Sequence, residues 1–165
     1  MSNPHNARQQ QFIDIIETNR PLISRICFMY AQDDDHFNDL YQEVLINLWQ
    51  GIEHFEGRSK VSTWIYRTCI NTCISCHRRS RRHTDGRNSL DAILELPADD
   101  TNTPAQLKQM YDMIAMLNDF DKGLIMMWLD ELSYDEISAI TGLNRNNVAS
   151  RLRRIKLKLI RQANS

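Results

Sequence analysis

The sequence has no long hydrophobic run and contains little glycine or proline. No stretch of its 165 residues approaches the roughly twenty apolar residues that a membrane-spanning helix needs. The N-terminus is polar where a secretory signal would be apolar. Five glycines and four prolines are too few for a collagen-like or low-complexity chain. We therefore expect a folded cytoplasmic protein that does not insert stably into a membrane.

The common sequence signatures of enzymes are also absent. The chain has no glycine-rich phosphate loop, no nucleophile elbow and no metal-binding histidine pair. A weak nuclease could use the acidic triplet at residues 33–35, but a solvated loop between helices explains this triplet better. We expect a protein that is not an enzyme, with no catalytic residues, no cofactor and no metal.

The alternation of period two that marks a β-strand is missing, whereas helical spacing of apolar residues is frequent. This spacing covers residues 12–30, 39–49 and 63–79, and it resumes from Leu107 to Leu117. Residues 83–106 are instead rich in Asp, Asn, Thr and Pro, as a linker would be. We predict an all-α protein with two small helical domains, residues 1–82 and 107–165, joined by an acidic flexible linker at 83–106.

The net charge of −1 hides a strong segregation of charge along the chain. Residues 53–83 carry seven Lys and Arg against two Asp and Glu, and residues 144–165 carry seven against none. The blocks at 1–52 and 84–143 are acidic, with seven and twelve Asp and Glu against three Lys and Arg each. Either basic block alone could be a solvated helix face. Together they predict two separate surfaces for a polyanion.

The clearest local signature is a helix-turn-helix near the C-terminus. A short helix with Tyr134, Ile137 and Ile140 inward would stop near Gly142, and Asn144 can cap a second helix. In a DNA-binding version, the start of this second helix enters the major groove. A helical hairpin with a charged face is the alternative. The predicted inward face consists of Val148, Leu152, Ile155 and Leu159, and the predicted outward face includes Arg145, Asn146, Ala149, Ser150, Arg153 and Arg154.

Two longer motifs resemble bacterial RNA polymerase sigma factors. The run "DLYQEVLINLWQGIEHFEGRSKVSTWIYRTCINTC" is similar to the family's second region, and "LSYDEISAITGLNRNNVASRLRRIKLKL" is similar to its fourth region. Their order and separation, with nothing substantial between them, resemble the extracytoplasmic-function (ECF) class of the sigma-70 family. The resemblance implies a second region at 12–82 and a fourth region at 107–162.

The resemblance implies a promoter-recognition subunit that binds core RNA polymerase and initiates transcription of a specific regulon. Its expected partners are the clamp coiled coil and flap of core polymerase, promoter DNA as duplex and as melted single strand, and an anti-sigma factor. The alternative is a single-protein helix-turn-helix regulator that binds duplex DNA without polymerase. This alternative leaves the basic, aromatic block at 53–83 unexplained.

The resemblance also implies roles for individual residues. Core polymerase binding is expected of Asp39, Leu40, Gln42, Glu43 and Asn47. Recognition of the minus 10 element is expected of Phe55, Lys60, Trp64, Arg67, Asn71, Arg78 and Arg79, although Trp64 suits a helical core equally well. Binding of the minus 35 element is expected of Arg145, Asn147, Ala149, Ser150, Arg151, Arg153 and Arg154. Ala149 departs from the family, which often has a basic residue at this position.

The cysteines allow two interpretations. Cys69, Cys73 and Cys76 share one helix face by their spacing, and Cys27 is available from an earlier helix. Such thiols could bind zinc or sense oxidants. The short spacings within one helix differ from the turn-borne pairs of most zinc sites, and reduced cysteine packs as a small hydrophobe. We therefore favour buried packing.

Overall fold

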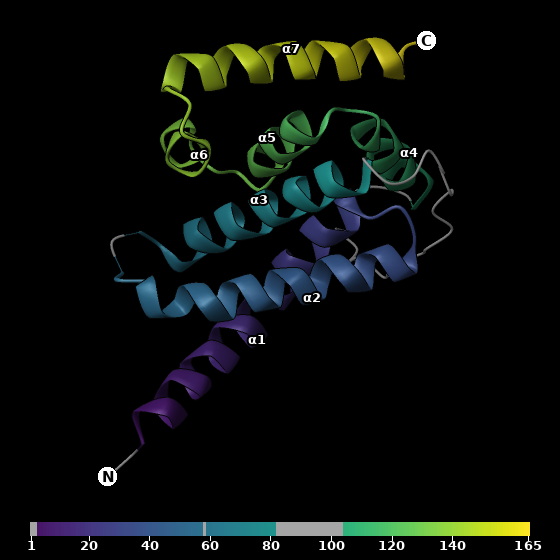
Figure 1. Cartoon of the computed structure of the whole chain (residues 1–165). Helices are drawn as coiled ribbons and strands as arrows, with labels where there is room; N and C mark the ends of the chain where they lie inside the picture. The colour runs from purple at the N-terminus through teal and green to yellow at the C-terminus, as the bar shows by residue number, and fades with distance from the viewer. Residues whose placement is uncertain (1–2, 58, 82–103) are drawn as a thin grey trace. The chain divides into compact units, whose positions relative to one another are not determined.

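The computed structural model describes residues 3–57, 59–81 and 104–165. Within these ranges the chain forms seven α-helices and one short 3-10 helix, with no strand (Figure 1). The predicted all-α class is therefore confirmed. The helices belong to two compact units, which are described separately below. Most of the predicted linker, 83–103, lies outside the described residues, whereas 104–106 belong to a helix that begins at Pro104.

The first unit contains α1 (Pro4–Tyr30), α2 (Asp34–Gly51), the 3-10 helix η1 (Ile52–His54) and α3 (Val61–Arg81). The three α-helices pack pairwise against one another. Their shared core includes side chains that are at most 1% exposed: Ile23, Ile26, Leu40, Val44, Leu48 and Ile65. Each of these residues lies on an apolar stripe of its helix, which is why the spacing of apolar residues located the helices.

The helices of the first unit start earlier than the apolar spacing predicted. Asn3 caps α1 by accepting a hydrogen bond from the His5 N–H (3.2 Å), and Pro4 follows in the first turn. Asp33 caps α2 by accepting from the His36 N–H (2.7 Å). The first turns of α1 and α2 are polar, so they contain no apolar spacing from which a helix could be predicted. Both helices begin where a side-chain cap satisfies unpaired backbone N–H groups.

The second unit contains α4 (Pro104–Ala115), α5 (Asp119–Leu129), α6 (Tyr134–Thr141) and α7 (Arg145–Ala163). The sequence pattern did not predict α5 as a separate helix. Every residue from Lys122 to Met127 is buried, so this helix lacks the alternation of apolar and polar faces on which the prediction depends. Asn118 caps α5 by accepting a hydrogen bond from the Asp121 N–H (2.8 Å).

The predicted helix-turn-helix is present as α6 and α7. Gly142 ends α6 with a φ of 79°, in the left-handed region that glycine adopts without strain. Asn144 then caps α7 by accepting from the Asn147 N–H (2.8 Å). Val148, Leu152 and Ile155 of α7 are buried as predicted, whereas Leu159 is only half-buried.

Candidate nucleic-acid interface

The polar residues predicted on α3 lie on one exposed face of the helix. Asn71 lies four residues after Arg67, and Arg78 lies seven residues after Asn71, so the three side chains share a face of the helix. All three are exposed, as is the neighbouring Arg79. Lys60 is exposed just before α3, where its carbonyl oxygen accepts the Trp64 N–H (3.2 Å). The structure therefore places two arginines and one amide on one face of α3, with two further exposed cations, Lys60 and Arg79, near it in the chain. Such a surface suits the backbone and base edges of a nucleic acid.

Two aromatic side chains stack beside this face. The rings of Phe55 and Trp64 are 5.0 Å apart between centroids, at an interplanar angle of 25°. Trp64 also lies against Gly51: a Cβ atom added at Gly51 would stand 3.4 Å from Cζ2 of Trp64. Both rings are half-buried. Trp64 therefore supports Phe55 and the end of α2, and each ring has partial exposure for a base.

The residues predicted to bind polymerase on α2 separate into two groups. Asp39 and Gln42 are exposed and Glu43 is half-buried. By contrast, Leu40 is only 1% exposed and belongs to the core. Asn47 donates a hydrogen bond to the Thr72 hydroxyl (2.8 Å), so it connects α2 with α3.

The structure adds one residue to this surface that the sequence analysis missed. Ile46 is 50% exposed and lies three residues beyond Glu43 and four beyond Gln42, on the same face. Its signal in the sequence is an isolated apolar residue on an otherwise polar face. A single exposed isoleucine is common on protein surfaces, and here it gives the face an apolar side chain beside its acidic and amide groups.

The ends of α1, α2 and α3 meet in a cluster of aromatic rings that the sequence did not reveal. His36 and His77 stack with centroids 5.4 Å apart, and Tyr30 meets His77 edge-on at 5.6 Å. His77 Nε2 hydrogen-bonds to the Tyr30 carbonyl oxygen, and the Gln32 N–H donates to His36 Nδ1 (3.0 Å). The cluster thus connects the end of α1, the beginning of α2 and the last turns of α3.

We expect the first unit to lose stability as the pH falls below 6.5. Burial lowers the pKa of His36 from 6.5, and His77 lowers it further, whereas Asp33 and Asp39 act in the opposite direction. Because the folded state binds the proton less readily than the unfolded state, protonation favours unfolding below 6.5. Hydrogen exchange of the α3 amides across this pH range measures the loss. His36→Gln should reduce the pH dependence, and an unchanged dependence would assign it to other groups.

Three of the four cysteines are packed in the core of the first unit. Cys27, Cys69 and Cys73 are 0% exposed. Burial raises the pKa of the Cys69 thiol, and a hydrogen bond with Cys27 followed by burial raises that of Cys73. Cys76 is half-buried and accepts from Arg79 Nη2 (3.2 Å). Buried packing is thus confirmed for these three thiols, and the described residues contain no group of three side chains suited to a metal.

The second helix of the helix-turn-helix presents most of the predicted DNA-binding residues to solvent. Asn147, Ser150, Arg153 and Arg154 are exposed, and Ala149 is half-buried. Arg145 is also exposed and lies 3.7 Å from Asp135 of α6. An ion pair this exposed contributes little to stability, so it would not prevent Arg145 from contacting DNA.

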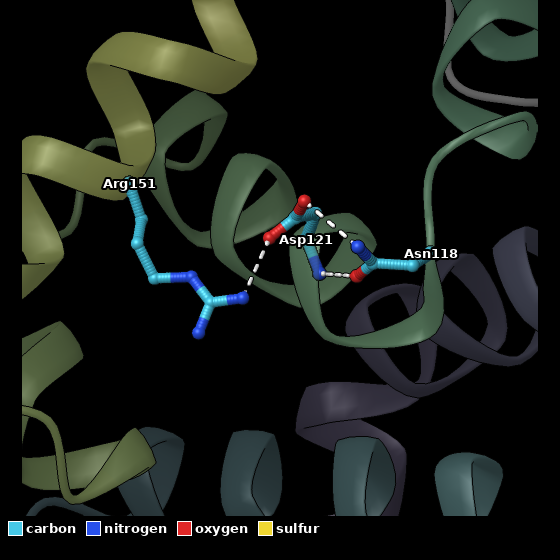
Figure 2. A network of polar contacts seen from close by, with 3 residues as sticks. All are labelled: Asn118, Asp121 and Arg151. Atoms are coloured by element: carbon cyan, nitrogen blue, oxygen red, sulfur yellow. Dashed lines mark hydrogen bonds and ion pairs between the residues drawn. The ribbon is translucent and has the colours of Figure 1, made fainter.

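Arg151 differs from the other predicted DNA-binding residues because it packs against α5. Its Nη2 atom lies 3.5 Å from Asp121 Oδ1, and its guanidinium lies 4.6 Å from the centroid of the Phe120 ring. Figure 2 shows that Asn118 holds Asp121 from the other side, through a bond from its Nδ2 to Asp121 Oδ2 (3.0 Å). Arg151 therefore connects α7 with α5 and is half-buried, whereas Arg145, Arg153 and Arg154 are exposed.

The comparisons with known proteins agree with both units. Residues 15–83 match the family model for sigma-70 region 2, and residues 107–159 match the model for sigma-70 region 4. The ECF RNA polymerase sigma factor SigW of Bacillus subtilis is 25% identical over 167 residues, which cover 93% of this chain and 89% of SigW. The chain belongs to the ECF class of the sigma-70 family.

Other relatives of this sigma factor extend the same result. The RNA polymerase sigma factor SigV of Bacillus subtilis is 25% identical over 137 residues, with coverage of 83% of this chain and 81% of SigV. The fold is similar to that of the sigma factor RpoE of Bartonella quintana, solved with the anti-sigma factor NepR. That similarity has a TM-score of 0.70 at 21% identity and covers 92% of each chain. No described helix of this sigma factor is long and apolar enough to cross a bilayer.

Proposed function

We propose that this sigma factor directs core RNA polymerase to promoters by holding two DNA elements on two separate units. The observation that carries the proposal is the pair of exposed basic faces, one on α3 and one on α7, each within the segment that matches a different sigma-70 region. We place its action in the cytoplasm, where the polymerase works. It initiates transcription as a recognition subunit and not as a catalyst.

On the first unit, the α3 face receives the melted minus 10 strand. Lys60, Arg67, Arg78 and Arg79 supply positive charge along the path of the backbone. The Phe55–Trp64 stack offers an aromatic surface for an unstacked base. Asn71, exposed on the same face, has an amide that can hydrogen-bond a base edge. Single-strand capture at this face would favour the melted state of the promoter.

On the second unit, the exposed start of α7 enters the major groove of the duplex minus 35 element. Ser150, Arg153 and Arg154 are the candidate readers of base edges, and Arg145 and Asn147 lie at the beginning of the helix. Ala149 can offer its methyl group to thymine but supplies no charge. Arg151 contributes indirectly, since it holds α7 on α5.

The α2 face containing Asp39, Gln42, Glu43 and Ile46 binds core polymerase in this proposal. Its carboxylates suit a basic protein surface and would repel the DNA backbone, and the Gln42 amide can hydrogen-bond to a protein partner. We place the polymerase clamp coiled coil on this face and the flap on the second unit. RpoE of Bartonella quintana was solved with an anti-sigma factor, and we propose that a comparable partner controls this chain.

Run-off transcription tests the proposed function directly. Core RNA polymerase from the source organism would transcribe fragmented genomic DNA with and without the purified protein. Specific transcripts that require the protein would establish it as a sigma factor, and their start sites would identify both promoter elements. Duplex binding without polymerase, in the absence of such transcripts, would instead indicate a helix-turn-helix regulator.

Asn71→Ala should impair promoter melting while sparing duplex binding. Loss of one hydrogen bond to a base corresponds to about 1 kcal/mol, or roughly a fivefold lower yield of open complex. Permanganate footprinting of the polymerase complex measures this yield. Ser75→Ala is a matched control, because Ser75 is exposed one turn further along α3. An unchanged open-complex yield for Asn71→Ala would remove this residue from the minus 10 site.

A further inference from the structure

The beginning of α1 contacts the region next to the proposed minus 10 site. The helix starts at Pro4, whereas the match to sigma-70 region 2 starts at residue 15. Arg8 lies in this preceding segment and makes three contacts with the end of α2 and with η1. It pairs through Nη1 with Glu53 Oε1, donates from Nη2 to the Trp49 carbonyl oxygen (3.1 Å), and covers the Trp49 ring at 4.5 Å from its centroid.

Two further side chains of α1 enclose the same tryptophan. Phe12 meets the Trp49 ring edge-on at 5.1 Å, and His5 approaches it at 6.4 Å between centroids. The Arg8 side chain is only 26% exposed, and its Nε is buried without a hydrogen-bond partner. Burying that N–H is unfavourable, so the contacts of the guanidinium must outweigh it to keep the side chain in place.

The segment held by Arg8 leads directly to the aromatic stack. Glu53 lies within η1, and Phe55 follows η1 and donates its N–H to the Ile52 carbonyl oxygen (3.3 Å). Phe55 stacks on Trp64, and the Trp64 ring lies against Gly51. In the sequence, Gly51 lies between Trp49 and η1. Arg8 therefore contacts both ends of the segment from Trp49 to Glu53, which comes just before Phe55 in the chain.

We propose that Arg8 is a positioning residue that holds η1 and Phe55 ready to receive the melted strand, without touching DNA itself. The proposal rests on the function proposed above for the first unit. Because the Arg8 guanidinium is engaged by Glu53 and Trp49, its charge is not presented as a phosphate contact. Because Phe55 would already be ordered, binding of an unstacked base would not carry the entropy cost of ordering this segment.

Two variants of the full chain test the proposal. Arg8→Met keeps the apolar stem but removes the guanidinium, and Arg8→Lys keeps the charge but loses the planar fork that contacts Glu53 and the Trp49 carbonyl together. Arg20→Met is the matched control, since Arg20 is on the same helix and pairs with Glu17 where both side chains are about 60% exposed.

The first measurement is hydrogen exchange without DNA or polymerase. We expect the amides of residues 49–57 to exchange about tenfold faster in Arg8→Met, with a smaller increase in Arg8→Lys and none in Arg20→Met. The α3 amides should keep their protection. Unchanged exchange at 49–57 in Arg8→Met would overturn the proposal, whether or not the protein acts as a sigma factor.

The second measurement is open-complex formation with core polymerase. We expect Arg8→Met to lower the yield about tenfold, while its salt dependence stays as in the wild type. Faster exchange at 49–57 with an unchanged yield would overturn the positioning role. A smaller salt slope, restored by Arg8→Lys, would also overturn it, because Arg8 would then be a phosphate contact. If the wild type forms no open complex, the proposed function fails and with it the positioning role, whatever the exchange result.

Discussion

Leu152→Ala should lower the free energy of unfolding of the second unit by about 2–5 kcal/mol. Leu152 is 0% exposed on the inner face of α7, between the buried Val148 and Ile155. This helix packs against α4, α5 and α6, so a shortened side chain leaves a cavity among several elements that cannot all close around it. A loss of this size is a large fraction of the total stability of so small a unit.

Denaturant unfolding, combined with hydrogen exchange of the α7 amides, measures this loss. Leu157→Ala is the matched control, since Leu157 lies on the same helix but is 46% exposed. The control should change stability by less than about 1 kcal/mol. The first unit should keep its protection in both variants. Equal effects of the two substitutions would contradict the assignment of the inner face of α7.

Arg154→Ala should weaken binding of the polymerase complex to a matched promoter by about 1–3 kcal/mol, or roughly 5- to 150-fold. Arg154 is exposed on α7, so the substitution leaves no cavity and should not change the stability of the unit. A bidentate contact from arginine to guanine discriminates among bases, so the loss should depend on the promoter sequence.

Binding to duplexes with single base changes in the minus 35 element measures this dependence. Lys158→Ala provides a comparison, because Lys158 is exposed further along the same helix and suits a phosphate contact. We expect it to weaken binding equally on all duplexes and to reduce the salt slope by about one. The same uniform loss for Arg154→Ala would show that Arg154 contacts phosphate and reads no base.

Local patterns in the sequence predicted much of this fold because helices depend on neighbouring residues. The turn at Gly142 and the cap at Asn144 follow from the preferences of these residues, and both are present. The pattern failed at α5, which is buried from Lys122 to Met127 and therefore shows no polar face. It also could not separate Leu40, a core residue, from the polar residues beside it in the sigma factor motif.

The contacts of individual side chains depended on helices that are distant in the sequence. His36 gains its partner His77 from α3, and the burial that lowers the pKa of His36 exists only in the folded unit. Ile46 became visible as a surface residue only when the packing of α2 against α3 was known.

The sequence by itself determined the all-α class and the two basic segments, because helical spacing and charge are local properties. The two sigma-70 regions followed from its resemblance to that family. Tertiary structure decided which of the cations face outward. Arg154 is exposed, whereas Arg151 pairs with Asp121 of α5 and Arg8 pairs with Glu53 of η1. The physical reason is that Arg151 and Arg8 each pair with a residue of another helix. Only the packing of these elements brings the side chains within the few ångströms that an ion pair requires.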